Sequence, residues 1–300
     1  MTMQKEKRYQ FITEGNETIS YILTSNDKPK LLLVHGNYSG ANHWLDVIEK
    51  LKDQFSLLVP DLRGYGESTY QTPIRSLEEL ALDVKELLIA LDWHEFDVIG
   101  WSLGGGVAME LAVLMPENVR KLVLSASLGV QGYPMYEFDM ETFQPIMDKP
   151  LTTYEQLVNN PIYVYPIETL KKNNDRDQLA MTLHAMSANV RVADDFMDIV
   201  VDTLMQQRNL VDANYALLVF NVTNQDTPAA KATNKIDKIK ADVLLLHGLK
   251  DQVVLPVMAQ LSKEFFKDQA ELILFEEAGH ALHSDQWEKW SNAVLEFLGE

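Results

Sequence analysis

The run FDVIGWSLGGG, residues 96–106, decides the fold of this chain. It begins with an apolar stretch of the kind found in strands that are buried on both faces. It ends in three glycines, which lead into the apolar helical pattern VAMELAVL. Between the two stand Gly100, Ser102 and Gly104 in the spacing G-x-S-x-G. A serine in a sharp turn between a strand and a helix is the context that this motif requires.

Similar apolar runs recur on both sides of this motif. They occupy residues 30–35, 55–60, 119–125, 242–247 and 270–275, and residues 8–13 and 18–23 predict a hairpin around Glu14-Gly15-Asn16. Helical periodicity alternates with them at residues 43–52, 76–91, 104–115, 256–267 and 285–298, and Ser76 with Glu79 forms a capping-box pattern. Strands that alternate with helices predict the α/β class, with a mostly parallel central sheet flanked by helices.

The alternation stops between residues 128 and 236. Helical patterns appear there at residues 153–159, 177–186, 192–207 and 209–219, without a buried strand. We therefore expect a core built from residues 1–127 and 237–300, with residues 128–236 inserted as a helical cap.

Composition excludes several classes of function. Against 26 basic residues stand 44 acidic ones, a net charge of -18, which repels nucleic acid and anionic lipid. The chain has no cysteine, so disulfides and thiolate chemistry are excluded. No apolar run approaches the roughly 20 residues that span a bilayer. The charged start, residues 1–8, lacks the pattern of a signal peptide. A cytoplasmic monomer or homodimer that acts on a small molecule is the expectation.

Signatures of cofactor and metal sites are missing. The glycines at 104–106 are not followed by the Lys-Ser/Thr of a phosphate loop, and no dinucleotide fingerprint follows a strand. His280, His283 and Asp285 lie close in sequence but belong to no recognised metal-ligand pattern. We expect neither a cofactor nor a metal.

A serine hydroxyl needs a base within hydrogen-bond reach to become a nucleophile. Among the seven histidines, His280 follows the last apolar run and precedes the final helix, with His283 as its competitor. The base in turn needs a carboxylate. Asp251 follows the strand at 242–247, and Glu276 and Glu277 are weaker substitutes. The order Ser102, Asp251, His280 predicts a catalytic triad.

With these residues in place, the chain resembles the α/β-hydrolase fold family, in the branch with a helical cap between the sixth and seventh strands. Val34-His35-Gly36-Asn37 is similar to the family's oxyanion loop, and residues 61–68 (DLRGYGES) to its turn after the strand at 55–60. The run GWSLGG is also similar to the elbow of pimeloyl-ester carboxylesterases. Because that elbow occurs in many relatives, it does not identify the substrate.

The resemblance implies an oxyanion hole made by the backbone N–H groups of Leu103 and Asn37. Asn37 could instead act through its side chain or be a turn residue. His35 is expected to support the loop by packing and hydrogen bonding. Trp101 is expected to line a substrate pocket. The aromatic and Met residues early in the insertion either line this pocket above Ser102 or form the cap's own small core: Tyr133, Met135, Tyr136, Phe138, Met140, Phe143 and Met147.

The resulting prediction is a serine hydrolase that cleaves a small, moderately apolar carboxylic ester through an acyl-enzyme. Three alternatives stay open. The same triad supports hydrolysis of a carbon–carbon bond, and also lactone opening or perhydrolysis. A small-molecule receptor on a hydrolase scaffold is the alternative from another class.

Overall fold

The computed structural model of the chain describes residues 7–25, 27–187 and 193–299. The charged start of the chain, before residue 7, and the first residue of the helix expected at 192–207 lie outside the described residues.

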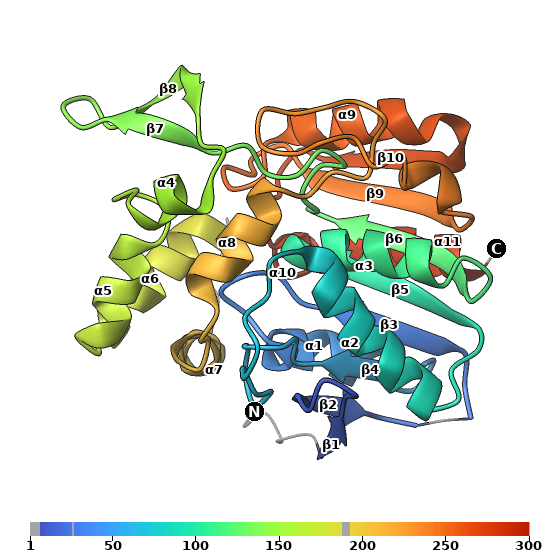
Figure 1. The fold of residues 1–300 in the computed structure, drawn as a ribbon. Helices are drawn as coiled ribbons and strands as arrows, with labels where there is room; N and C mark the ends of the chain where they lie inside the picture. The colour runs from blue at the N-terminus through green and yellow to red at the C-terminus, as the bar shows by residue number, and fades with distance from the viewer. Residues whose placement is uncertain (1–6, 26, 188–192, 300) are drawn as a thin grey trace.

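One eight-stranded sheet forms the centre of the molecule (Figure 1), in the order β1-β2-β4-β3-β5-β6-β9-β10. Its strands are β1 (Arg8–Ile12), β2 (Thr18–Leu23), β3 (Lys30–Val34), β4 (Ser56–Pro60), β5 (Phe96–Trp101), β6 (Val119–Ser125), β9 (Asp242–Gly248) and β10 (Ala270–Phe275). The hairpin β1–β2 and the β2–β4 pair are antiparallel, and the remaining pairs are parallel. The prediction of a mostly parallel sheet is therefore confirmed.

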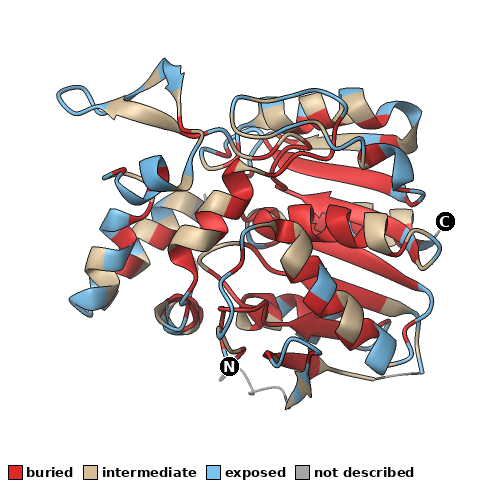
Figure 2. Cartoon of the chain, viewed as in Figure 1, coloured by how far each residue is buried: buried red, intermediate tan, exposed pale blue. Residues whose placement is uncertain are grey.

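Helices cover both faces of this sheet. One face packs against α2 (Leu77–Ala90), α3 (Leu103–Leu114) and α9 (Pro256–Phe266), and the other against α1 (Leu45–Leu51) and α11 (Trp287–Gly299). Two further short elements precede helices, η1 (Ala41–Trp44) and α10 (Leu282–Asp285). Alternate side chains of each central strand enter opposite cores: Leu32 lies in one and Leu31 and Leu33 in the other. Figure 2 shows the central strands of the sheet almost wholly buried, which explains why their sequences are continuously apolar.

The start of α2 shows how local sequence sets an element boundary. Ser76 precedes the helix, and its side chain accepts a hydrogen bond from the backbone N–H of Glu79. The predicted capping box forms only in part, because the Glu79 carboxylate accepts from the backbone of Arg75.

The segment between β6 and β9 lies beside the carboxyl edge of the parallel strands (Figure 1). Its helices are α4 (Tyr154–Val158), α5 (Tyr165–Lys172), α6 (Arg176–Ser187), α7 (Asp194–Met205) and α8 (Leu210–Leu218). It also contains an antiparallel hairpin of β7 (Tyr136–Asp139) and β8 (Gln144–Pro150), which the sequence did not predict. Most residues of this hairpin are exposed or half-buried, and Pro145 and Pro150 lie in β8, so the usual strand signals are missing.

The order of the strands determines where a site can form. The chain passes from β3 to β4 on one side and then returns to β5 on the other side of β3. Ligands of parallel α/β sheets bind outside the carboxyl ends of the strands at such a reversal. In this chain the loops after β3 and β5 carry Asn37 and Ser102.

Two short 3-10 helices precede strands of the sheet: η2 (Ile236–Lys238) precedes β9, and η3 (Lys267–Gln269) precedes β10.

Within the described ranges, no helix is both long and apolar enough to span a membrane.

Candidate active site

Ser102 occupies a strained turn between β5 and α3. Its backbone has φ 55° and ψ −121°, a conformation that non-glycine residues rarely adopt. The flanking glycines make this turn possible. A Cβ at Gly100 would lie 2.4 Å from the carbonyl oxygen of Gly104, and a Cβ at Gly104 would lie 2.3 Å from that of Val34. Strain of this kind persists only where the surrounding structure enforces it, and it concentrates at functional sites.

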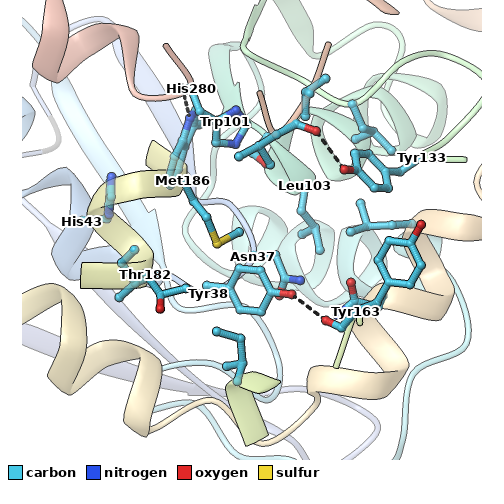
Figure 3. A pocket seen from close by; sticks show the side chains of 18 of the residues that line it. Asn37, Tyr38, His43, Trp101, Leu103, Tyr133, Tyr163, Thr182, Met186 and His280 are labelled. Atoms are coloured by element: carbon cyan, nitrogen blue, oxygen red, sulfur yellow. Dashed lines mark hydrogen bonds between the residues drawn. The ribbon is translucent and has the colours of Figure 1, made fainter. Parts of the chain in front are cut away.

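The turn delivers Ser102 into a cavity of about 250 Å³. The core contributes Asn37, Leu103 and His280 to its wall. The segment between β6 and β9 contributes mainly apolar and aromatic side chains: Leu128, Tyr133, Ile162, Tyr163, Pro166, Ile167, Leu183, Met186, Val200 and Leu217. Figure 3 shows this cavity, with His280 and Trp101 on one side and Tyr133 and Tyr163 on the other.

Asp251 and His280 are joined by a hydrogen bond. The His280 Nδ1 lies 2.8 Å from Asp251 Oδ2, and because a carboxylate only accepts, Nδ1 donates. The second oxygen, Oδ1, accepts from the backbone N–H groups of Val253 and Val254 at 2.8 and 2.9 Å. The carboxylate is therefore held at both ends, and the His280 Nε2 is left to face away from it.

His247 also lies against this carboxylate. Its Nε2 donates to the carbonyl of Val254 at 2.7 Å and lies 3.4 Å from Asp251 Oδ2. Burial by itself raises the pKa of Asp251, but the charge of protonated His280 and hydrogen bonds from both histidines outweigh it. The pKa of Asp251 therefore lies well below its ordinary value, so Asp251 carries its negative charge at neutral pH.

Ser102 and His280 line the same cavity. Trp101, the neighbour of Ser102, donates its indole N–H to the backbone carbonyl of His280 at 2.8 Å, which ties the two loops together. Within the described residues, no hydrogen bond joins the Ser102 hydroxyl to the His280 ring. Hydrogen bonds between catalytic groups are often long in ligand-free proteins and tighten when substrate binds.

Two backbone N–H groups at the corner of the cavity next to Ser102 have no hydrogen-bond partner among the described residues, as is also true of a few others of the wall. These two belong to Leu103, the first residue of α3, and to Asn37, in the loop after β3. The N-terminus of a helix carries partial positive charge, so this corner of the cavity suits a negatively charged oxygen.

The loop after β3 is fastened by its side chains. His35 is fully buried; its Nδ1 donates to the Gly36 carbonyl at 2.8 Å and its Nε2 accepts from Leu62 N–H at 3.0 Å. Burial lowers the pKa of His35, so the ring is neutral. The Oδ1 atom of Asn37 accepts from Tyr65 and Gln207, which holds the carboxamide oxygen against those two donors.

The alternative candidates for the base and for its carboxylate partner have different surroundings from those of His280 and Asp251. His283 is buried among the rings of Trp44, Trp101 and Trp290, and neither ring nitrogen has a hydrogen-bond partner among the described residues. Glu276 and Glu277 are exposed, and Glu277 pairs with Lys250.

The predicted pocket residues separate into two groups. Trp101 and Tyr133 line the cavity beside Ser102. Met135, Tyr136 and Phe138 do not, and for these three the pocket prediction needs correction. Met135 and Tyr136 line a second cavity with Met147, and Phe138 lines a shallow one with Met140. The reason is the β7–β8 hairpin, which turns the chain away from the sheet directly after Tyr133.

Other cavity residues were not predicted. Tyr38 has a positive φ of 56° and follows Asn37, and its hydroxyl donates to the Tyr163 carbonyl. Leu183 and Val200 come from the apolar faces of α6 and α7. The helical periodicity of these segments marks an apolar face, but it does not identify what that face contacts.

The described residues contain no group of three or more His, Cys, Asp or Glu side chains that could hold a metal ion.

Comparison with curated proteins finds relatives across much of the chain. A 2-hydroxymuconate semialdehyde hydrolase of Pseudomonas sp. is 24% identical, over 90% of this chain and 87% of its own. A pimeloyl-[acyl-carrier protein] methyl ester esterase of Nitrosomonas europaea is 26% identical, over 87% of this chain and 92% of its own. Three further curated relatives are 37% identical over 102 residues only, so the match spans 34% of this chain and 30% of their length.

Solved structures share the same fold. A hydrolase from Pseudomonas aeruginosa superposes with a TM-score of 0.75 at 21% identity, covering 99% of this chain and 100% of that one. The family model of the alpha/beta hydrolase fold matches residues 29–286, which include the strained serine, the carboxylate and the histidine. The chain therefore belongs to the α/β-hydrolase fold family.

Proposed function

We propose that this chain is a serine hydrolase that cleaves a small, moderately apolar carboxylic ester. Ser102 is the nucleophile, His280 the general base and Asp251 the carboxylate that orients it. The backbone N–H groups of Leu103 and Asn37 form the oxyanion hole. Residues 128–236 act as a cap over the cavity.

One observation carries this proposal. Ser102, which lies in a strained turn, lines the same cavity as His280, and the Nδ1 of His280 donates to the buried carboxylate of Asp251. Because Nδ1 donates to Asp251, Nε2 is unprotonated in the neutral ring and can accept the serine proton.

The reaction proceeds by acyl transfer. His280 takes the Ser102 proton while Oγ forms a bond to the ester carbonyl, and the two N–H groups stabilise the oxyanion. When this intermediate collapses, the bond to the alcohol breaks and His280 returns its proton to the departing oxygen. Water, deprotonated by His280, then attacks the acyl-enzyme and releases the acid and free Ser102. Each oxyanion donor contributes roughly 3–4 kcal/mol by precedent elsewhere.

The composition of the cavity supports a moderately apolar substrate. Its wall combines aliphatic and aromatic side chains with few polar groups, as expected of a small-molecule site. The cap assignment is supported by the same wall, because core and inserted segment contribute to it together.

Substitution of the nucleophile tests this proposal. Ser102→Ala removes the only atom that becomes acylated, so kcat for a p-nitrophenyl ester should fall by at least about 10⁴-fold. Circular dichroism should show an unchanged fold.

Ser39→Ala provides a matched control. Ser39 is buried in the neighbouring loop, its hydroxyl has no partner in the described part of the chain, and it is not among the residues of the cavity wall. This variant should retain wild-type turnover. Ester hydrolysis that survives in Ser102→Ala would remove the nucleophile assignment.

Hydrolysis of a carbon–carbon bond is a second candidate, favoured by the relative named as a 2-hydroxymuconate semialdehyde hydrolase. The same nucleophile and base would serve it. A panel of esters, a lactone and a vinylogous diketone, assayed on wild type and Ser102→Ala, separates the candidates by their kcat/KM values.

A fluorophosphonate probe distinguishes a serine hydrolase from a small-molecule receptor on the same scaffold. Rapid labelling at Ser102 indicates an activated serine, and absence of labelling favours the receptor. The cytoplasmic location and the monomeric or homodimeric state stay predictions.

A further inference from the structure

The side chain of Asn37 is held by donors from two distant parts of the chain. Its Oδ1 accepts from the Tyr65 hydroxyl at 3.0 Å and from the Gln207 Nε2 at 2.8 Å. Tyr65 lies in the turn after β4, whereas Gln207 lies between α7 and α8 in the segment between β6 and β9. A residue of the inserted segment therefore reaches the loop that carries a proposed oxyanion donor.

A backbone carbonyl sets the direction of this hydrogen-bond chain. Asn209 Nδ2 donates to the carbonyl of Arg63 at 2.8 Å, and a carbonyl can only accept. Asn209 must then turn its Oδ1 toward Gln207, whose Nε2 donates to it at 3.0 Å. The same Nε2 is thereby presented to the Oδ1 of Asn37.

The side chains that form this hydrogen-bond network around Asn37 are buried. Gln207 is 3% exposed, Asn209 1% and Tyr65 0%. Arg208, between the first two, donates its backbone N–H to the Gly64 carbonyl at 2.8 Å, and its guanidinium contacts the carbonyls of Gly66 and Ser68. The junction at residues 207–209 is thus fastened to the turn after β4 by contacts that do not involve Gln207.

We infer that Gln207 is a positioning residue for the oxyanion hole, an inference that rests on the function proposed above. Gln207 and Tyr65 hold the carboxamide of Asn37 outside the path of the substrate and fix the loop, so that the backbone N–H of Asn37 points into the cavity. The placement of the inserted segment is in this way coupled to the chemistry at Ser102.

The loop needs such support. Tyr38, the next residue, has a positive φ of 56°, so the peptide bonds around Asn37 are not held by regular structure. Figure 3 shows Asn37 and Tyr38 side by side at the cavity wall, with Leu103 nearby. An oxyanion donor must be placed within a few tenths of an ångström, and a displacement near 1 Å can lower the rate about 100-fold.

Gln207→Met tests the inference. Methionine keeps the length and the unbranched shape of glutamine but cannot donate, and the Gln207 Oε1 that it removes has no partner among the described residues. We expect kcat for a p-nitrophenyl ester to fall about ten-fold while KM changes less than about two-fold, because the lost geometry acts on the transition state. Affinity for a trifluoromethyl ketone should fall in parallel with kcat/KM, whereas affinity for the product alcohol should not.

Two further variants separate positioning from packing. Gln206→Met changes the exposed neighbour in the same way and should leave kcat unchanged. Tyr65→Phe removes the other donor to Asn37, together with the contact of the same hydroxyl with Asn209, and should reproduce the loss in kcat. If Gln207→Met fails to fold, Tyr65→Phe carries the test alone, and wild-type kcat in this variant overturns the inference.

A double-mutant cycle with Asn37→Ala completes the experiment. This substitution removes the shared acceptor but keeps the backbone N–H, so Gln207→Met should cause no further loss of kcat in its background. Additive losses would overturn the inference, as would wild-type kcat in Gln207→Met. Failure of the proposed function is distinguishable, because wild-type protein would then neither hydrolyse the ester nor label with fluorophosphonate at Ser102.

Discussion

At the scale of single residues, the two oxygens of Asp251 face different partners. Oδ1 accepts two backbone N–H groups and Oδ2 faces His280. Only an acceptor at the second position keeps the proton on Nδ1 of His280 and leaves Nε2 unprotonated, as the proposed role of His280 requires. Asp251 therefore acts on His280 in two ways, through its negative charge and through accepting the Nδ1 proton. An amide at this position removes the charge and replaces one acceptor by a donor.

We expect Asp251→Asn to lower kcat by about 10⁴-fold, because an NH₂ group facing His280 forces the proton onto Nε2. Steady-state kinetics with a p-nitrophenyl ester measure the loss. Glu277→Gln makes the same chemical change at an exposed carboxylate and should retain wild-type kcat. Equal activity of Asp251→Asn and wild type would show that another carboxylate orients the base.

His280 and His283 show what residue spacing alone leaves open. Both follow the last strand of the sheet, and both are buried. His280 faces a carboxylate, whereas His283 is surrounded by tryptophans. The sequence favoured His280 because it follows the last apolar run and precedes the final helix, but the carboxylate next to it comes from the loop after another strand.

At the scale of elements, three consecutive glycines at the start of α3 weaken the helix locally, by about 1 kcal/mol each relative to alanine. Close packing requires the glycines at 104 and 105. A Cβ at Gly104 would lie 2.3 Å from the Val34 carbonyl oxygen, and one at Gly105 would lie 2.0 Å from the Ser127 hydroxyl. The helix can approach the end of β3 and the segment after β6 so closely only because these side chains are absent.

Gly104→Ala should therefore destabilise the protein by at least about 2 kcal/mol, because α3 must move away from β3 to accommodate the methyl group. The displacement also moves Ser102, so turnover should fall as well. Urea denaturation measures the stability. Gly129→Ala is the matched control, since its added Cβ would meet no atom closer than 3.5 Å. Equal stability of the two variants would contradict the packing argument.

The elements themselves were predicted from the sequence with unequal success. The expected strands and core helices are confirmed within a few residues, because each combines a clear apolar pattern with turn or capping residues at its ends. The β7–β8 hairpin and α5 were missed. The hairpin buries little, so burial imposes no alternation on its sequence, and α5 is a short helix with Pro166 near its start.

At the scale of the whole molecule, several histidines are buried without charge. Burial lowers the pKa of His35, lowers that of His43 well below its ordinary value, and lowers that of His283 to about 4. For His43, the nearby ring of His283 adds to the effect. His43 also stacks on Trp101 at a centroid distance of 4.3 Å. Each ring therefore enters the folded protein in its neutral form.

Acid should destabilise the protein through these rings. Below about pH 6.5 the unfolded chain binds protons that the native chain does not bind, down to about pH 4 for His283. The free energy of unfolding should therefore fall with pH in this window, by up to about 1.4 kcal/mol per pH unit for each histidine.

Urea denaturation between pH 7 and pH 5 measures this slope. His283→Phe places an apolar ring among the tryptophans. It should reduce the slope of the unfolding free energy against pH by up to about 1.4 kcal/mol per pH unit, which corresponds to one proton. A slope identical to that of the wild type would contradict the assignment of His283 as a buried neutral ring.

The sequence by itself determined the alternation of strands and helices, the strained turn at Ser102 and the order of the three candidate residues. These properties are local, since apolar periodicity, glycine spacing and capping residues act within a few positions of the chain. Asp251 also lies where the sequence predicts it, in the loop after the strand at 242–247, because a strand end is itself a local feature.

The tertiary structure alone decided which distant side chains meet. Gln207 donates to Asn37, 170 positions away in the sequence. Met135 and Tyr136 line a second cavity, and His283 contacts the rings of tryptophans. No local pattern encodes these contacts, because they depend on how segments far apart in the sequence pack against one another. Long-range packing, which the local pattern permits but does not specify, therefore determines the wall of the cavity.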